Sequence, residues 1–104
     1  MKIEFADYVE GFGGELKCPS CNEFYLHHQR IDIYEREEGA KTGLHITVEN
    51  LKITTDQNLE GNPSRDRHGL TITFWCEHCD AAPKLSLSQH KGNTWVDFNH
   101  DKTT

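Results

Sequence analysis

Two cysteine pairs have the spacing of metal ligands, Cys18-Pro19-Ser20-Cys21 and Cys76-Glu77-His78-Cys79. A Cys-x2-Cys turn presents two thiolates to one ion, and a tetrahedral zinc ion takes four such ligands. The residue after the second cysteine often takes a positive φ, which Asn22 and Asp80 tolerate well at these positions. We therefore predict one structural zinc ion in a closed site. Its four ligands are Cys18, Cys21, Cys76 and Cys79.

Iron and disulfides are the alternative uses of these cysteines. Four thiolates also bind iron, so iron is the chemical rival of zinc in the same cage. The chain begins Met1-Lys2-Ile3-Glu4-Phe5, without the apolar stretch of a secretion signal, and no run of transmembrane length follows. We therefore expect a cytoplasmic protein with no membrane partner, in which two disulfides are the less favoured hypothesis.

The composition limits both the core and the partners. The 104 residues fit one domain, residues 1–104, and a hydrophobic content of 35% leaves a small core. A core of that size usually needs a metal or another cross-link to be stable. The formal net charge of −6 repels phosphate backbones, and only Arg65 and Arg67 lie close together among the basic residues. We therefore expect a protein partner and disfavour nucleic acid, and the composition sets no oligomeric state.

Alternation of apolar and polar residues predicts strands along most of the chain. The segments that show it are residues 22–36, 44–48, 51–54, 70–75, 85–88 and 94–98. A change of parity near His28-Gln29 predicts a bulge, and Asn50 and His90-Lys91-Gly92-Asn93 predict tight turns. No segment shows sustained helical periodicity. The predicted fold is all-β, a small antiparallel zinc-ribbon-like sheet of about six or seven strands with a long insertion between the two cysteine pairs.

Two segments fall outside this pattern. Residues 1–16 contain four acidic residues, and no Lys or Arg lies between positions 3 and 16. The acidic residues are Glu4, Asp7, Glu10 and Glu15. We predict that this segment is a solvated leader that is partly mobile. Residues 56–69 form the longest loop, and a polar loop of that length in a small domain is either mobile or functional.

The chain has seven histidines, a high number for its length. His78 lies between the cysteines of the second pair, and four cysteines leave it outside the cage. A second metal site from His27 or His28 with His45 on a neighbouring strand is a minority hypothesis. The favoured interpretation is that the histidines titrate near neutrality without binding a metal.

The sequence gives little support for an enzyme. In the 56–69 loop, His68, Asn62 and Asp66 are residue types that a metal-dependent nuclease uses, but the pattern lacks a helix to hold the metal. Zinc deaminases combine His-x-Glu with a cysteine pair, and no His-x-Glu occurs in this chain. We therefore expect no enzymatic activity.

Trp75 and Trp95 are expected on the surface, because each alternates with the apolar residues of its strand. Aromatic residues on a sheet can stack on the bases of a single strand. Exposed aromatic surface beside acidic groups suits a protein interface better. The tryptophans therefore favour a protein partner over nucleic acid.

The two cysteine pairs and the strands beside them resemble the zinc-ribbon group, in which two such knuckles clamp a small sheet around a structural zinc ion. Asn22 and Asp80 depart from the glycine usual in these knuckles. The chain length, the long insertion and Gly61-Asn62-Pro63-Ser64 also resemble small zinc-ribbon proteins encoded in bacteriophage and prophage genomes. That resemblance transfers no known activity, but it implies the host cytoplasm as location and a host factor as partner.

The function that we predict is a non-enzymatic, zinc-stabilised protein-binding module, either an adaptor or an inhibitor. An inhibitor whose acidic surface imitates DNA is a special case, and it would use the four acidic residues of the leader. The second hypothesis is a nucleic-acid-binding zinc ribbon that uses Arg65, Arg67 and the aromatic residues. The third is a metal-dependent nuclease.

Overall fold

The computed structural model describes residues 3–99, which form strands, turns and loops. Its eight strands are β1 (Phe5–Val9), β2 (Gly13–Leu16), β3 (Leu26–Glu35), β4 (Leu44–Glu49), β5 (Lys52–Asp56), β6 (Gly69–Cys76), β7 (Lys84–His90) and β8 (Asn93–Asn99). All strand pairs are antiparallel. Residues 3–99 contain no helix, and hence none with the length and apolarity needed to cross a bilayer. The all-β prediction is confirmed, and the six or seven strands expected become eight.

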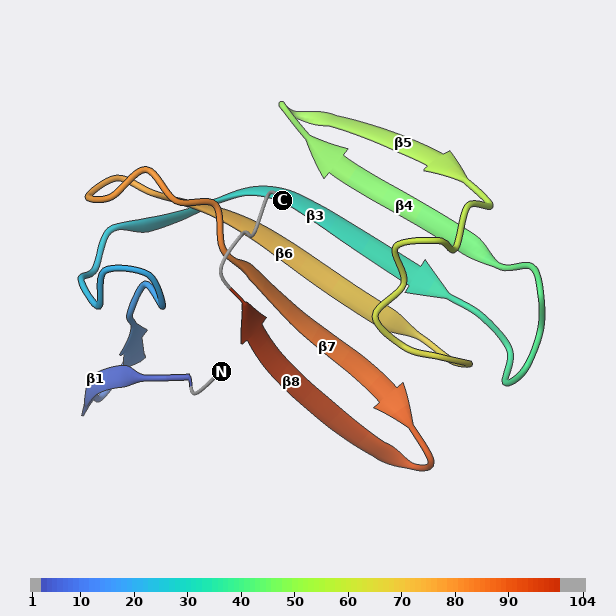
Figure 1. Ribbon diagram of the computed structural model, residues 1–104, viewed down its shortest axis with the longest axis horizontal. Helices are drawn as coiled ribbons and strands as arrows, with labels where there is room; N and C mark the ends of the chain where they lie inside the picture. The colour runs from blue at the N-terminus through green and yellow to red at the C-terminus, as the bar shows by residue number, and fades with distance from the viewer. Residues whose placement is uncertain (1–2, 100–104) are drawn as a thin grey trace.

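The strands form two sheets. One has six strands in the order β5-β4-β3-β6-β7-β8, and the other consists of β1 and β2. Figure 1 shows the six strands as one curved layer, with β1 beside one end of it. The two central strands are β3 and β6, and Leu26 at the start of β3 pairs with Cys76 at the end of β6. This pairing brings the two cysteine pairs to the same end of the sheet, although the long insertion separates them in sequence.

Local irregularities lie where the sequence predicts them. The β3–β6 register shifts between His28 and Arg30, which is the expected bulge. The β4–β5 turn places Asn50 at φ 54° and Leu51 at φ 63°, the backbone of a tight hairpin turn. The β7–β8 turn does the same with Lys91 at φ 51° and Gly92. These features fix the register of the sheet and therefore which side chains share a face.

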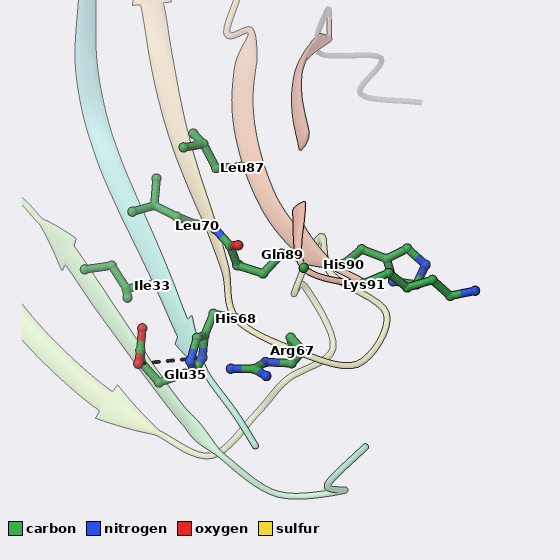
Figure 2. Close-up of a pocket in the computed structure, with 11 residues that line it drawn as sticks. Ile33, Glu35, Arg67, His68, Leu70, Leu87, Gln89, His90 and Lys91 are labelled. Atoms are coloured by element: carbon green, nitrogen blue, oxygen red, sulfur yellow. Dashed lines mark ion pairs between the residues drawn. The ribbon is translucent and has the colours of Figure 1, made fainter. Parts of the chain in front are cut away.

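Residues paired directly across neighbouring strands point to the same face of the sheet. The apolar residues of one face include Ile31, Ile33, Ile46, Val48, Ile53, Leu70, Ile72, Phe74, Leu85, Leu87, Val96 and Phe98, and we call it the apolar face. The polar face consists of Arg30, Asp32, Tyr34, His45, Thr47, Thr54, Asp56, Thr71, Thr73, Ser86, Trp95 and Asp97. Figure 2 shows Ile33, Leu70 and Leu87 of the apolar face on three neighbouring strands. The outward position predicted for Trp95 is confirmed, because Trp95 lies opposite Ser88 and is 58% exposed.

Residues 5–16, predicted as a leader, form the hairpin β1–β2. Phe5 pairs with Leu16, and the amide of Lys17 donates a hydrogen bond to the carbonyl of Glu4 (3.0 Å). The turn is closed by the amide of Phe12, which donates to the carbonyl of Val9 (2.9 Å). The expected mobility of the segment stays a prediction, while its conformation is a two-stranded sheet.

The 56–69 loop is tied to the sheet by side-chain hydrogen bonds. The buried Ser64 donates from Oγ to the carbonyl of Gln89 (2.7 Å), and Arg36 donates to the carbonyl of Ser64 (3.2 Å). Gly61 lies so close to the Tyr34 hydroxyl that an added Cβ would be 2.6 Å from it. Because Tyr34 belongs to the polar face, the loop crosses that face of the sheet.

Candidate metal centre

The four cysteines lie at one end of the main sheet, where β3 begins and β6 ends. Cys18 and Cys21 lie in the turn between β2 and β3, Cys76 is the last residue of β6, and Cys79 follows in the next turn. The amide of Glu77 donates to the carbonyl of Tyr25 (3.1 Å), which links the two turns through their backbones. The long insertion folds back as β3–β6 and so carries the second pair to the first.

The two turns have the same backbone conformation. In the first, the amide of Asn22 donates to the carbonyl of Cys18 (2.8 Å) with Asn22 at φ 64°. In the second, the amide of Asp80 donates to the carbonyl of Cys76 (2.8 Å) with Asp80 at φ 66°. The positive φ expected at both positions is confirmed, and asparagine and aspartate tolerate this conformation well.

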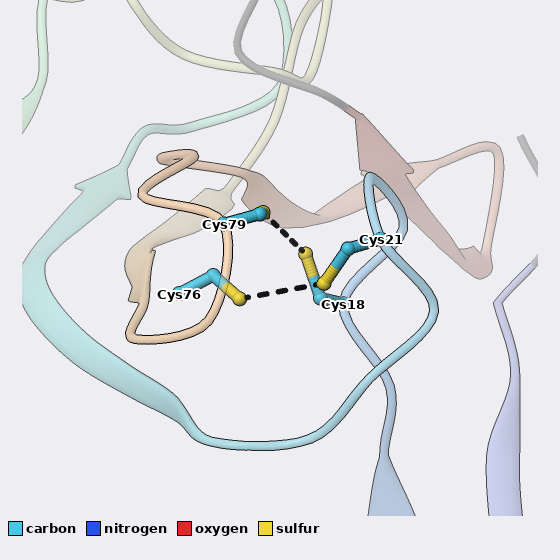
Figure 3. A group of neighbouring side chains, drawn as sticks. All are labelled: Cys18, Cys21, Cys76 and Cys79. Carbon is cyan, nitrogen blue, oxygen red and sulfur yellow. Dashed lines mark hydrogen bonds between the residues drawn. The ribbon is translucent and has the colours of Figure 1, made fainter.

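The four sulfur atoms form a compact cluster. They lie within 4.8 Å of one another, with Cys18 Sγ 3.8 Å from Cys79 Sγ and Cys21 Sγ 3.7 Å from Cys76 Sγ. Each of these pairs joins one turn to the other (Figure 3). Four sulfurs at about 2.3 Å from a tetrahedral ion are about 3.8 Å apart, whereas a disulfide needs about 2.05 Å. The four thiols are free, and the cluster can therefore hold one metal ion.

The thiols do not ionise equally in this cluster. Burial raises the pKa of Cys18, and it raises the pKa of Cys21 to about 12. At Cys76, burial acts in the same direction but is outweighed by backbone donors from Cys79 and His78 and by the neighbouring thiols, so its pKa is lowered. Because metal ligation requires thiolates, metal binding at Cys18 and Cys21 releases protons.

Side chains next to the second turn hold it against β3. Trp75 donates from Nε1 to Asp80 Oδ1 (2.6 Å), so the aspartate that replaces glycine also anchors the indole. The ring of His27 stacks on Trp75 with centroids 5.8 Å apart, and its Nε2 lies 2.8 Å from Glu77 Oε1. His78 is exposed and does not belong to the sulfur cluster, as the sequence predicts.

A buried polar cluster on the polar face was not predicted from the sequence. His45 lies between two carboxylates, with Nε2 2.8 Å from Asp32 Oδ1 and Nδ1 2.9 Å from Asp56 Oδ1. Asp32 also accepts hydrogen bonds from Thr47 Oγ1 (3.1 Å) and from Arg30 Nε (3.0 Å). We call these five residues the Asp32–His45 cluster. The signal in the sequence was that Asp32, His45 and Thr47 all occupy the polar positions of their strands. Their contacts follow from this alternation only once the β3–β4 register is known.

The Asp32–His45 cluster is charged, and its members Asp32, His45 and Thr47 are buried. Burial lowers the pKa of His45, but the hydrogen bonds that its ring donates to both carboxylates outweigh burial, so the net shift is upward. Burial raises the pKa of Asp32, but Arg30 and His45 outweigh it and lower that pKa. The ring of Tyr34 stacks on His45 at 4.4 Å and 6° and covers the ion pair. Both ring nitrogens of His45 are engaged, which leaves neither for a metal or a substrate.

The residues of the other site hypotheses are not assembled into a site. Within residues 3–99, the cysteines are the one group of three or more side chains placed to hold a metal ion. His68 accepts a hydrogen bond from the Arg36 amide (3.0 Å), and Asn62 donates to the Arg67 carbonyl (2.9 Å). Arg65 is exposed, while Arg67 lies 3.9 Å from Glu38. These contacts tie the 56–69 loop together and to the segment that follows β3.

No protein-family model, curated protein or solved structure matches this chain. The four-cysteine cluster is consistent with a zinc-ribbon site on the geometry of its sulfur atoms. The resemblance to bacteriophage-encoded proteins stays a prediction from the sequence.

Proposed function

We propose that this chain is a non-enzymatic, zinc-stabilised module that binds a protein, acting as an adaptor or an inhibitor. The observation that carries the protein-binding role is the β1–β2 hairpin. It forms a sheet separate from the main one, and Phe12 and Tyr8 are 92% and 76% exposed. Phe5 and Val9 on the same hairpin are also exposed. Aromatic side chains concentrated on a separate element are typical of binding surfaces.

Zinc is the metal that we propose for the cysteine cluster. A site with four thiolates has no position left for water or substrate, which is the pattern of a structural ion. The hairpin also leads directly into the first knuckle, since one residue, Lys17, separates the end of β2 from Cys18. The metal therefore supports the base of the hairpin as well as the end of the sheet.

The charge of the hairpin indicates the chemistry of its partner. Glu4, Asp7, Glu10 and Glu15 are all exposed, and positions 3–16 contain no basic residue. A complementary partner has an apolar groove with a basic rim, because opposite potentials favour encounter and exclude other partners. The resemblance to phage-encoded zinc ribbons points to a host protein as this partner. A DNA-binding host protein is the special case in which the acidic residues replace phosphates.

The experiment is affinity capture from a nuclease-treated bacterial lysate, with bound material identified by mass spectrometry. The test variant combines Tyr8→Ser with Phe12→Ser, which removes both exposed rings from the hairpin. The control is Trp95→Ser, which removes a ring that is also exposed but lies on β8. We expect one protein to be retained by the wild type and the control and lost with the double variant.

Two outcomes would overturn this proposal. Retention of nucleic acid alone, lost on nuclease treatment, would favour the basic residues of the 56–69 loop. Equal retention by the double variant would remove the hairpin from the binding surface. All baits should contain one zinc per chain, so that loss of binding is separated from loss of folding.

A further inference from the structure

The apolar face extends across the whole width of the main sheet. All six strands contribute to it, from Ile53 on the edge strand β5 to Val96 on the edge strand β8. Among the Asp, Glu, Lys and Arg residues of these strands, Glu35 at the end of β3 is the one whose position falls on this face. The sheet therefore has a broad surface without charge in its centre.

No second layer covers most of this face. Ile53 is 71% exposed and Val96 is 50% exposed, and the residues between them on β3, β4, β6 and β7 are half-buried. Phe98, near the cysteine cluster, is the member that is fully buried. A sheet normally buries its apolar face against another layer of secondary structure. Within residues 3–99, neither a helix nor the β1–β2 sheet supplies that layer.

One end of the apolar face is hollowed. A cavity of about 420 Å³ has apolar lining from Ile33, Leu70 and Leu87 and basic lining from Arg67, His68, His90 and Lys91 (Figure 2). Glu35 also lines it and lies 3.6 Å from His68. The apolar face is therefore not flat, and an apolar side chain from another layer can enter the cavity.

We propose that the apolar face binds the same face of a second copy, so that two sheets form a sandwich around a two-fold axis. A two-fold contact sets the same patch of both copies against itself, and an uncharged patch does so without repulsion. Glu35 excepted, the acidic residues of the six strands lie on the polar face, so the net charge of −6 does not oppose itself across this contact. A different protein that is recognised through charge complementarity would have no charged group to pair with at the centre of this face.

The area of the face is sufficient for a specific dimer. Six strands at about 4.8 Å spacing and about six residues at about 3.4 Å each cover roughly 500–600 Å². Two copies therefore bury about 1,000–1,200 Å², which is near the lower limit for specific interfaces. Sheets that stack face to face are about 10 Å apart, a distance that interlocking isoleucine and leucine side chains fill.

The test is the mass of the protein in solution, measured by sedimentation velocity from micromolar to several hundred micromolar. The variant Ile53→Lys with Val96→Lys places charge on the apolar face at two exposed positions, where the fold tolerates it. The matched control is Thr54→Lys with Trp95→Lys, which adds the same charge to the same edge strands on the polar face. Zinc content and circular dichroism check that each variant is folded.

We expect twice the single-chain mass of 12.0 kDa for the wild type and the control. For the apolar-face variant we expect a dissociation constant raised by about 100-fold or more, because lysines would be buried without a partner. A wild type that stays at 12.0 kDa at every concentration would overturn the proposal and leave the face to an unlike partner. A dimer weakened equally by both variants would also overturn it, because that result indicates pairing of the strand edges.

Discussion

The polar and apolar faces of the main sheet differ in what covers them. Asp32 and His45 on the polar face are each 7% exposed, beneath Tyr34 and the 56–69 loop, whereas Ile53 on the apolar face lies largely in solvent. In most small domains the apolar side is the buried one. Here the buried residues of the single chain are mainly polar groups with hydrogen-bond partners and cysteines of the metal cluster. The comparison teaches that the buried interior of the single chain is built from the cysteine cluster and an ion-pair network, while much of its apolar surface is exposed.

The largest effect is expected at the cysteine cluster, which closes one end of both faces. Cys76→Ser removes one ligand from the strand that pairs with β3, so the two knuckles lose their common ion. The total free energy of unfolding of a small domain is about 5–15 kcal/mol. A structural metal supplies much of this free energy. We expect the cooperative unfolding transition in urea, followed by tryptophan fluorescence, to disappear. A chelator should have the same effect on the wild type.

The control for this change is His78→Ala, at an exposed position between the cysteines of the second turn, which keeps the backbone hydrogen bond from His78 to Cys76. It should unfold like the wild type. A Cys76→Ser variant that also unfolds like the wild type would show that the cluster does not stabilise the fold.

The next effect is expected on the polar face. Asp32→Ala leaves Arg30 and His45 without the carboxylate that accepts their hydrogen bonds. Removing one partner of a buried ion pair costs about 3–5 kcal/mol of unfolding free energy, which urea titration measures. Thr54→Ala, on the same face but exposed, should cost less than about 0.5 kcal/mol. A loss below about 1 kcal/mol for Asp32→Ala would mean that the buried network is not a source of stability.

A smaller effect is expected from pH. The raised pKa of His45 means that its contribution is complete below its unfolded pKa of about 6.5 and is lost as the pH rises through the folded value. The lowered pKa of Asp32 gives a contribution present above about 4 and lost as the pH falls through its folded value. The cluster is therefore most stabilising between about pH 4 and pH 6.5.

The comparison that isolates this effect is wild type against His45→Gln, because the metal site and the other histidines are common to both. The difference in unfolding free energy between the wild type and His45→Gln should be larger at about pH 6 than at about pH 9. A gap that stays constant or widens toward high pH would contradict a protonated His45 between two carboxylates.

The smallest effect is expected on the apolar face of the single chain. Ile53→Thr changes a side chain that is mostly in solvent, so in dilute solution it should cost less than about 1 kcal/mol of unfolding free energy. At concentrations where the proposed dimer forms, the cost should increase, because the dimer buries this position. A large cost that does not depend on concentration would mean that the apolar face is already covered in one chain.

Features encoded within a few residues were predictable from the sequence. The strands followed from alternation, the bulge from a change of parity near His28, and the turn at Asn50 from its tolerance of positive φ. The positive φ of Asn22 and Asp80 followed from the spacing of the cysteines. These are local properties of the backbone and need no knowledge of distant contacts.

Features that depend on distant segments were not predictable. The β1–β2 hairpin was missed because β2 begins with Gly13 and Gly14, which break the alternation that marks a strand. The Asp32–His45 cluster was missed because polar positions on a strand normally face water. Here Tyr34 stacks on His45, and Gly61 of the 56–69 loop lies against the hydroxyl of Tyr34.

The measurement that tests the account most directly is native mass spectrometry of the purified protein. The account predicts one zinc ion per chain, with all four cysteines as ligands and no disulfide. Denaturation in acid should release the metal and leave four thiols that react with iodoacetamide. A folded chain without metal, or a chain whose mass shows two disulfides, would contradict the zinc centre and the stability that we attribute to it.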